Sequence, residues 1–521
     1  MANKQLFKSR PGRLPPETNA RNEAGGQAYA LSPQAALAQY AATGCLNATF
    51  YADAAMQLDT VLDWCVAVEP AFVAKTAIYA RQRGQMKDMP ALLTAWLAQH
   101  GPDWLESCFA KVIDNGRMLR NFVQILRSGA VGRKSLGSRP KRLVQNWLNE
   151  RTDGQLLSAS VGNDPSLADV LKMVHPKPAT PERTALYAWL IGKLYDAALL
   201  PEAIQALERF KSDVEAPVPD VPFQLLTALP LKPQHWVAIA CQAPWQMTRM
   251  NLNTFARHDV FKVGGMAQRI AQRLRDPAAI RRARVFPYQL LSAYTMTDAA
   301  VPEIVRDALQ EALDVALDVA LENVPELPGQ VYVLLDVSGS MASPVTGHRK
   351  GATSKVRCVD VAALVAAALS AKNPVTEILP FDTRVHAHRL NRRDSVLTQA
   401  RMLAEFGGGG TNCGLPLATL NQRKAMGDLV IYVSDNESWA DLQRGRGTET
   451  MRQWETFRQR NPRARLACID IQPYATVQAQ TREDVLNVGG FSDAVFEVLA
   501  RFAAGQLDGE HWVREIKAVE V

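Results

Sequence analysis

The chain has 521 residues, which is too long for one compact domain and predicts two or three. Lys and Arg number 59 against 52 Asp and Glu, and the formal net charge of +7 excludes a strongly acidic scaffold while permitting a nucleic-acid partner. A hydrophobic content of 47% with 21% charged residues is typical of globular proteins and excludes wholesale disorder.

The cysteines and the N-terminal sequence bear on the cellular environment. The seven cysteines are scattered and include no C-x-x-C pair, which excludes a disulfide framework or zinc module and indicates a reducing interior. The start, MANKQLFKSRPGRLPPE, has no apolar signal segment, and no run of about 18 apolar residues occurs. We therefore expect a soluble, cytoplasmic protein without a membrane span.

The first two thirds of the chain predict helices. Residues 1–28 are polar, with Gly, Pro and Asn, and predict a flexible N-terminal arm. From residue 29 to 325 apolar residues recur at i, i+3 or i+4 and i+7, which predicts an all-α domain of amphipathic helices. The pattern places helices at 70–83, 89–99, 103–128, 141–149 and 183–197. Many helices with short turns between them are typical of HEAT-like helical repeats.

The pattern changes after the linker 322–329, and residues 329–521 predict an α/β domain. Continuous apolar runs, which suit strands buried on both faces, occur at 331–337, 377–382, 428–435 and 465–471. Helical segments alternate with them at 356–371, at 395–406, after glycines 407–410, at 448–460 and at 492–504. This alternation predicts a doubly wound, Rossmann-like parallel sheet, in which ligands bind at the carboxyl ends of the strands.

A group of candidate oxygen ligands is expected at that edge of the sheet. Asp336, Ser338 and Ser340 form a D-x-S-x-S motif at the end of the first strand, Thr411 follows the tetraglycine, and Asp435 ends the third strand. Carboxylate and hydroxyl oxygens suit a divalent cation, above all Mg²⁺. The motif alone is equally compatible with a loop cap. Because the group includes no activated nucleophile and no second metal cluster, a hydrolase is not expected.

Basic residues are concentrated in two runs, 117–151 and 249–284, with nine Lys or Arg in each. Two such runs favour polyanion binding, although solvated helix faces would give the same pattern. In the first run a turn at 132–142 with Gly and Ser precedes a helix, and backbone N–H groups at a helix start favour phosphate. The candidate phosphate contacts there are Arg133, Lys134, Arg139, Lys141 and Arg142.

His175 lies at an expected helix end, in the sequence LKMVHPKP, beside Lys172 and Lys177. A lone histidine in such a place is more often a helix cap or a packing residue than a ligand. The residue is therefore compatible with both roles at this point.

Five segments in this order resemble the TROVE module of the Ro autoantigen family, in its bacterial Ro-like branch. They are KTAIYARQRGQMKDMPALLTAWLA (75–98), GRKSLGSRPKRLVQNWL (132–148), PSLADVLKMVHPKP (165–178), NLNTFARHDVF (251–261) and ARVFPYQLLSAY (283–294). The five candidate metal ligands resemble the metal-ion-dependent adhesion site of von Willebrand factor A domains, where a partner's carboxylate can complete the cation's shell. The family has the same domain order, and the resemblance covers about 30–520.

The resemblance implies a monomeric ring of HEAT-like repeats closed by the A domain. It implies binding of Y RNA on a basic outer surface and passage of the 3′ ends of misfolded small RNAs through the hole. It further implies a non-enzymatic scaffold or chaperone in RNA quality control and decay, with an exoribonuclease such as polynucleotide phosphorylase as a bacterial partner. The alternative is a metal-dependent protein-interaction scaffold without RNA function.

The family's Y RNA-binding segment adds two candidate contacts. His175 matches a histidine that the family associates with Y RNA binding, and Lys172 lies one helical turn before it. Family members often carry Lys and Arg just before this segment, whereas 156–166 here has no basic residue. The Y RNA contact is therefore expected to be weaker there or shifted onto 133–142.

Overall fold

The computed structural model describes residues 13–43, 46–283, 287–322, 326–348, 355–391, 393–438, 447–490 and 494–521. These residues form two compact units. The first, here called the α/β unit, joins the described residues up to Val68 to Leu317–Ala518. The second, the helical unit, contains Glu69–Ala316 with Val519–Val521. A helical region is thus followed along the chain by a parallel-sheet α/β domain, which confirms the predicted fold class.

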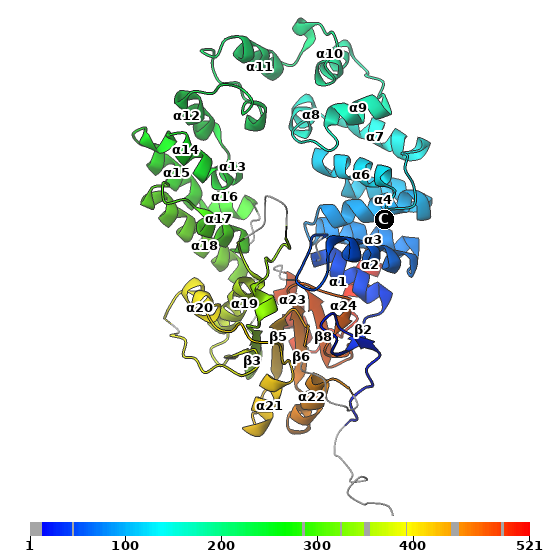
Figure 1. The fold of residues 1–521 in the computed structure, drawn as a ribbon, viewed down its shortest axis with the longest axis vertical. Coiled ribbons are helices and arrows are strands. Elements are labelled where there is room, and N and C mark those ends of the chain that lie inside the picture. The colour runs from blue at the N-terminus through cyan, green and yellow to red at the C-terminus, as the bar shows by residue number, and fades with distance from the viewer. Residues whose placement is uncertain are drawn as a thin grey trace, which may run out of the picture. The chain divides into compact units, whose positions relative to one another are not determined.

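The described part of the helical unit is made of helices with short connections between most of them (Figure 1). Their bounds are α3 Pro70–Gln82, α4 Asp88–His100, α5 Pro102–Val112, α6 Gly116–Ser128, α7 Ser138–Glu150, α8 Asp153–Ala159, α9 Leu167–Val174, α10 Pro181–Leu190, α11 Glu202–Ser212, α12 Pro233–Gln242, α13 Trp245–Met250, α14 Leu252–Arg257, α15 Met266–Arg275, α16 Pro277–Ala283, α17 Pro287–Met296 and α18 Glu303–Glu322.

Local chemistry sets several of these ends and corrects two expectations. The single helix expected at 103–128 is wrong, because Asn115 accepts a hydrogen bond from the Met118 amide at 3.0 Å and starts a new helix, α6. The helix expected at 183–197 is too long, because α10 ends at Leu190 and Gly192 follows with a φ of +70°.

Apolar stripes pack the neighbouring helices together, as the 3.6-residue period predicts. In α6 the buried side chains include Met118, Leu119, Phe122, Val123 and Leu126. Helix α6 packs against α4, α8 and α9, and α9 packs in turn against α7. The first basic run and the segment that ends at His175 are therefore neighbours in space.

A five-stranded parallel sheet of order β4-β3-β5-β6-β8 forms the centre of the α/β unit. Its strands are β3 Val331–Asp336, β4 Glu377–Phe381, β5 Leu429–Ser434, β6 Arg465–Asp470 and β8 Val485–Gly489. The helices that follow its strands are α19 Cys358–Lys372, α20 Val396–Leu403, α21 Leu415–Gln422, α22 Glu449–Arg460, α23 Ala494–Ala503 and α24 His511–Lys517. Because Leu335 of β3 lies opposite Val433 of β5, these two strands end at the same edge of the sheet.

The described N-terminal residues belong to the α/β unit. Strands β1 Ala20–Arg21 and β2 Gln27–Ala30 form a hairpin, and β2 pairs antiparallel with β7 Thr476–Val477. Helix α1 Pro33–Thr43 packs against β8, α24 and α2 Ala54–Val66, and Figure 1 shows these blue elements beside the red C-terminal ones. The described part of the expected arm 1–28 is therefore tied to the sheet. The expected helical domain 29–325 likewise has its first residues packed with the α/β unit.

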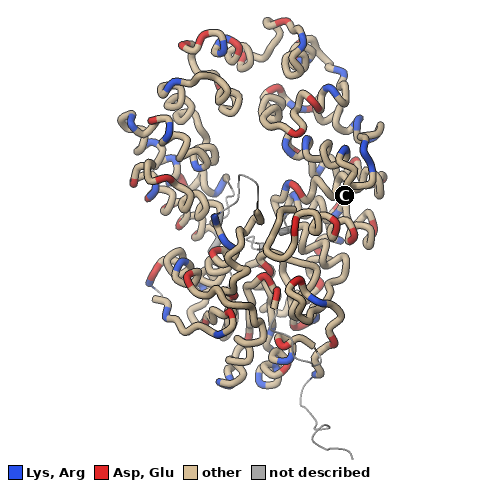
Figure 2. Tube along the Cα trace, viewed as in Figure 1, with Lys and Arg blue, Asp and Glu red and all other residues tan. Residues whose placement is uncertain are grey.

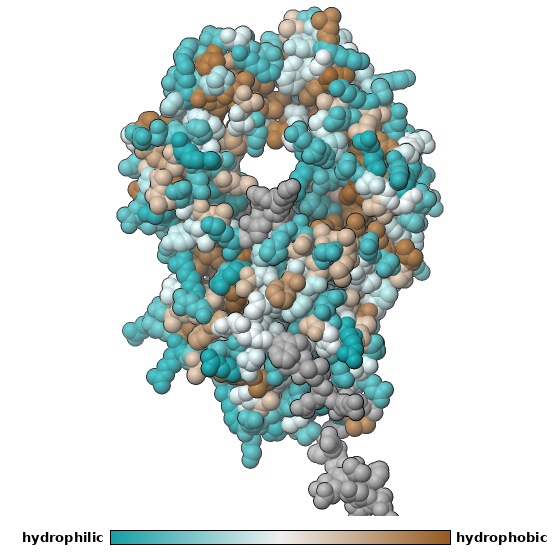
Figure 3. Space-filling model, viewed as in Figure 1, coloured by the Kyte–Doolittle hydropathy of each residue, from teal (hydrophilic) through white to brown (hydrophobic). Residues whose placement is uncertain are grey.

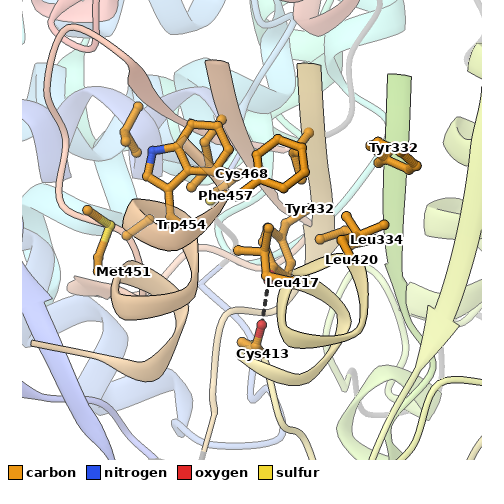
Figure 4. Packing of buried hydrophobic residues seen from close by; sticks show 14 of the residues in the cluster. Tyr332, Leu334, Cys413, Leu417, Leu420, Tyr432, Met451, Trp454, Phe457 and Cys468 are labelled. Carbon is orange, nitrogen blue, oxygen red and sulfur yellow. Dashed lines mark hydrogen bonds between the residues drawn. The ribbon is translucent and has the colours of Figure 1, made fainter. Parts of the chain in front are cut away.

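The core of the α/β unit holds large side chains from the sheet and from α21 and α22 (Figure 4). Trp454 and Phe457 of α22 stack with ring centroids 5.7 Å apart, and the buried Tyr432 hydroxyl donates to the Cys413 carbonyl at 2.5 Å. Cys65, Cys108, Cys241, Cys358, Cys413 and Cys468 are free thiols, and Cys45 lies outside the described residues. Within the described ranges, every helix is too short or too polar to span a lipid bilayer.

Candidate nucleic-acid interface and cation site

The first basic run contains side chains of two kinds. Arg133 donates to the carbonyls of Ala98 and Ser135, both at 2.9 Å, and Arg139 donates to the Pro102 carbonyl at 2.6 Å. These two arginines therefore hold the turn before α7 against α4 and the start of α5. Their guanidinium groups are partly committed to the fold, so they are weaker candidates for phosphate contacts than the sequence suggested.

Lys134, Lys141, Arg142 and Lys172 form the second kind. Within the part of the chain that the structure describes, none of them makes an ion pair within 4 Å, and all except the half-buried Lys141 are exposed. Figure 2 shows Lys and Arg gathered in the region of α6 and α7. Positive charges that form no close ion pair suit a polyanion, although Asp169 near Lys172 offsets part of the charge there.

His175 is the C-cap of α9, as one of the two sequence interpretations held. Its amide donates to the Leu171 carbonyl at 2.9 Å, and its φ of +51° lies in the left-handed region that glycine favours. Gln145 of α7 donates to the carbonyls of Val174 at 2.5 Å and His175 at 3.3 Å. The cap is therefore made by the backbone and held by α7, while the imidazole itself is exposed.

One turn of α7 connects Lys141 with Gln145, and one turn of α9 connects Lys172 with His175. Because Gln145 contacts the His175 backbone, these side chains form one continuous surface, here called the α7–α9 surface. A hollow of about 420 Å³ beside it is lined by Gln124 and Arg127 of α6, by Lys172 and also by the acidic side chains of Asp164 and Asp169. Arg127 belongs to the first basic run but is not among the contacts predicted from the sequence. Its position beside Lys172 of α9 results from tertiary packing, which the sequence pattern does not show.

The second basic run is largely engaged in holding helices together. Arg273 donates to the carbonyls of Ala240 at 2.7 Å and Cys241 at 2.9 Å, and Arg249 donates to that of Gln289 at 2.8 Å. Arg275 pairs with Glu311 at 2.5 Å. Arg284 lies outside the described residues. This run is therefore the weaker candidate for an RNA surface.

The distribution of apolar and hydrophilic residues on the helical unit favours the same region. On the face shown in Figure 3, apolar residues gather around α10 and α11, where Leu194 is 99% exposed, whereas hydrophilic residues cover the region of α6 and α7. A strongly charged ligand such as RNA is expected at the second region.

The candidate cation site lies where β3 and β5 end. The Asp336 carboxylate accepts hydrogen bonds from the Ser338 amide at 2.8 Å and from the Ser434 hydroxyl at 2.5 Å. The hydroxyls of Ser338 and Ser340 are 3.3 Å apart, and Ser340 is hydrogen-bonded to Asp435. The structure thus brings together four of the five candidate ligands.

The tetraglycine loop brings the fifth candidate, Thr411, to the same edge. The Gly339 amide donates to the Gly409 carbonyl at 2.8 Å, and the Gly408 amide donates to the Val337 carbonyl at 3.0 Å. A Cβ at Gly407, whose φ is +101°, would lie 1.7 Å from the Val337 carbonyl oxygen. Only glycine allows this approach, which lays the loop that ends at Thr411 against the D-x-S-x-S motif.

Two buried carboxylates face each other at this site, and no described cationic side chain pairs with either of them. Burial, followed by the charge of Asp435, raises the pKa of Asp336 from 3.8 to about 7. Burial also raises the pKa of Asp435. In the described ranges neither residue pairs with Lys, Arg or His, and no group of three His, Cys, Asp or Glu side chains could hold a metal. Two carboxylates and three hydroxyls fit Mg²⁺, whose charge would offset the repulsion.

Comparisons with known proteins show which family and which fold this chain resembles. Residues 330–503 match the family model described as the Ro60 vWA domain. The chain is 26% identical to the RNA-binding protein RO60 of Deinococcus radiodurans over 529 aligned residues. The alignment covers 94% of this chain and 96% of that protein. The chain is thus similar to a bacterial Ro protein over most of its length. The crystal structure of the Deinococcus radiodurans RO (RSR) protein matches this structure with a TM-score of 0.62 and 22% sequence identity. The match covers 91% of this chain and 100% of that chain, and it shows that the two have the same fold.

Proposed function

We propose that this Ro-like chain binds small noncoding RNA through the α7–α9 surface. The observation that carries the proposal is the set of basic side chains there that make no ion pair within 4 Å among the described residues, next to the exposed His175. The relative from Deinococcus, named as an RNA-binding protein, supports the same assignment. Lys134, Lys141, Arg142, Lys172 and Arg127 would contact phosphates, and His175 would contact a base.

The finer role follows from the family resemblance. We propose that the RNAs include Y RNA-like and misfolded small RNAs, and that the protein is a non-enzymatic scaffold or chaperone in RNA quality control. A monomeric ring and a partner exoribonuclease such as polynucleotide phosphorylase belong to this proposal.

The same proposal includes a Mg²⁺ site in the α/β unit. Asp336, Ser338, Ser340, Thr411 and Asp435 would hold the cation, directly or through bound water. The cation would neutralise the facing carboxylates, and the chain's hydroxyls would orient its shell. The support for this part is the buried pair of carboxylates, with which no Lys, Arg or His of the described ranges pairs.

A charge-matched pair of triple variants tests the RNA surface. Lys134→Ala, Lys141→Ala and Arg142→Ala together should weaken binding to structured RNA and flatten its salt dependence, because each phosphate contact contributes a slope of roughly −0.7 to −0.9. The control, Arg257→Ala, Lys262→Ala and Arg282→Ala, removes the same charge from the second run and should change affinity much less. Gel shifts over a salt series would measure both. An equal loss in the two proteins would contradict a localised surface and indicate attraction by net charge alone.

A further inference from the structure

All five candidate cation ligands are shielded from solvent. Asp336 is 0% exposed, and the other four, Ser338, Ser340, Thr411 and Asp435, are each exposed by 5% or less. A cation site that takes a carboxylate from another protein must offer an open position to it. These five side chains are therefore covered by other residues of the chain.

A segment far upstream in the sequence lies against the metal motif. The His348 amide donates to the Ala48 carbonyl at 2.7 Å, and the Asn47 side-chain amide donates to the Thr346 carbonyl at 2.9 Å. Gln57 of α2 donates to the Asn47 carbonyl at 2.5 Å and braces the segment from its other side. Residues 46–53, here called the covering segment, are thus fixed to the loop that continues the D-x-S-x-S motif. They belong to the same compact unit as that loop.

Tyr51 is the residue of this segment that reaches the candidate ligands. Its hydroxyl is hydrogen-bonded to Ser340, the same side chain that bonds Asp435. Its ring packs edge-on against Tyr474 with centroids 5.9 Å apart, and the Tyr474 hydroxyl donates to Thr49 at 3.1 Å.

We propose that Tyr51 closes the candidate cation site from within the chain. The bound cation then holds the covering segment against the sheet and is inaccessible to a partner's carboxylate. This inference rests on the proposed Mg²⁺ site. The Tyr51 hydroxyl on Ser340 takes the place that an external carboxylate would need, and the Tyr474 ring packs against the Tyr51 ring. The site is then an internal brace of the α/β unit rather than an adhesion site.

The experiment compares Mg²⁺ binding with and without a free carboxylate. Isothermal titration of the full chain with MgCl₂ is run in buffer alone and with tens of millimolar sodium acetate, at constant ionic strength. In the wild type acetate should leave the affinity unchanged. In Tyr51→Ala the position beside Ser340 is open to acetate. Acetate should then raise the Mg²⁺ affinity by about threefold or more, because it binds the cation-bound protein and so favours that form. The matched control is Tyr474→Phe, which loses a hydroxyl from the same aromatic pair but not the one on Ser340, and which should behave as wild type.

Amide hydrogen exchange of the wild type provides a second test that does not depend on the folding of any variant. Saturating Mg²⁺ should slow exchange of the described amides 47–52 in the wild type by about tenfold, since opening the segment would then require release of the cation. No Mg²⁺ binding in the wild type overturns the cation site and this inference with it. Mg²⁺ binding that acetate strengthens in the wild type, or that leaves exchange at 47–52 unchanged, overturns the inference and leaves the cation site standing.

Discussion

The change Asp336→Asn tests whether the carboxylate pair is built for a cation. The substitution removes one of two facing buried charges and keeps the size of the side chain. The rise in the pKa of Asp336 from 3.8 to about 7 corresponds to a cost of about 4 kcal/mol for holding the charged form in the cation-free protein. The loss of charge weakens the bonds from Ser338 and Ser434 by about 1 kcal/mol each. The cation-free variant should therefore be about 2 kcal/mol more stable than cation-free wild type at pH 8.

The sign of the pH dependence follows from the direction of this shift. The folded wild type holds a proton on Asp336 over a range in which the unfolded chain has lost it, between about pH 4 and pH 7. This carboxyl therefore makes the folded protein lose stability as pH rises through that window, and above pH 7 the full cost remains. Asp336→Asn has no such loss, so its advantage should be small at pH 5 and largest at pH 8.

Calorimetry of the full chain in EDTA at pH 5 and pH 8, followed by addition of Mg²⁺, measures both effects. Mg²⁺ should stabilise the wild type and leave Asp336→Asn unchanged. The matched control is Asp484→Asn in the same unit. Burial alone would raise the pKa of Asp484, but hydrogen bonds from Arg482 and Trp454 lower it, and Arg458 lies at 3.0 Å. That variant should lose about 3–5 kcal/mol at pH 8 and still respond to Mg²⁺. A destabilised Asp336→Asn protein at pH 8 in EDTA would refute the reasoning.

Two further outcomes concern the helical unit. His175→Ser should cost about 1–3 kcal/mol in affinity for a cognate RNA, the range for one base contact, without lowering the melting temperature; lowered stability with unchanged affinity would make the residue a structural cap only. Arg133→Ala should lower the stability of the helical unit by about 1–2 kcal/mol through the loss of its bonds to Ala98 and Ser135, and change the salt dependence of RNA binding less than Arg142→Ala does. Thermal melting and gel shifts on the two arginine variants would show the opposite pattern if Arg133 were the phosphate contact.

Much of the α/β unit could be predicted from the sequence because its strands are buried on both faces. Such strands leave continuous apolar runs, and the runs at 331–337, 377–382, 428–435 and 465–471 match four strands of the sheet. The fifth, β8, was missed because its run is short and contains Asn487, whose side chain bonds Ala479 and Thr481. The candidate cation ligands could also be predicted, because they follow the ends of parallel strands and such ends meet at one edge of a sheet.

The candidate RNA contacts were less accessible to sequence reasoning. Charge alone does not distinguish Arg133, which binds carbonyl groups of its own unit, from Arg142, which has no such bond in the described structure. Both are arginines of the same basic run, and only the packing of α4 beside the turn shows that they have different roles. The covering segment around Tyr51 was missed altogether, because its partners at Ser340 and His348 are distant in the sequence and no local motif marks the contact.

The two proposed chemistries lie on different compact units, and this limits how the cation can affect RNA binding. Every candidate RNA contact belongs to the helical unit, whereas the cation ligands and Tyr51 belong to the α/β unit. A cation bound by Asp336 and Asp435 would be held by buried ligands of the α/β unit, with none of the candidate RNA contacts among them. Its binding free energy would instead stabilise the unit that Tyr51 helps to close. The cation is therefore expected to act on the stability of the α/β unit, and the basic side chains of the α7–α9 surface to determine the affinity for RNA.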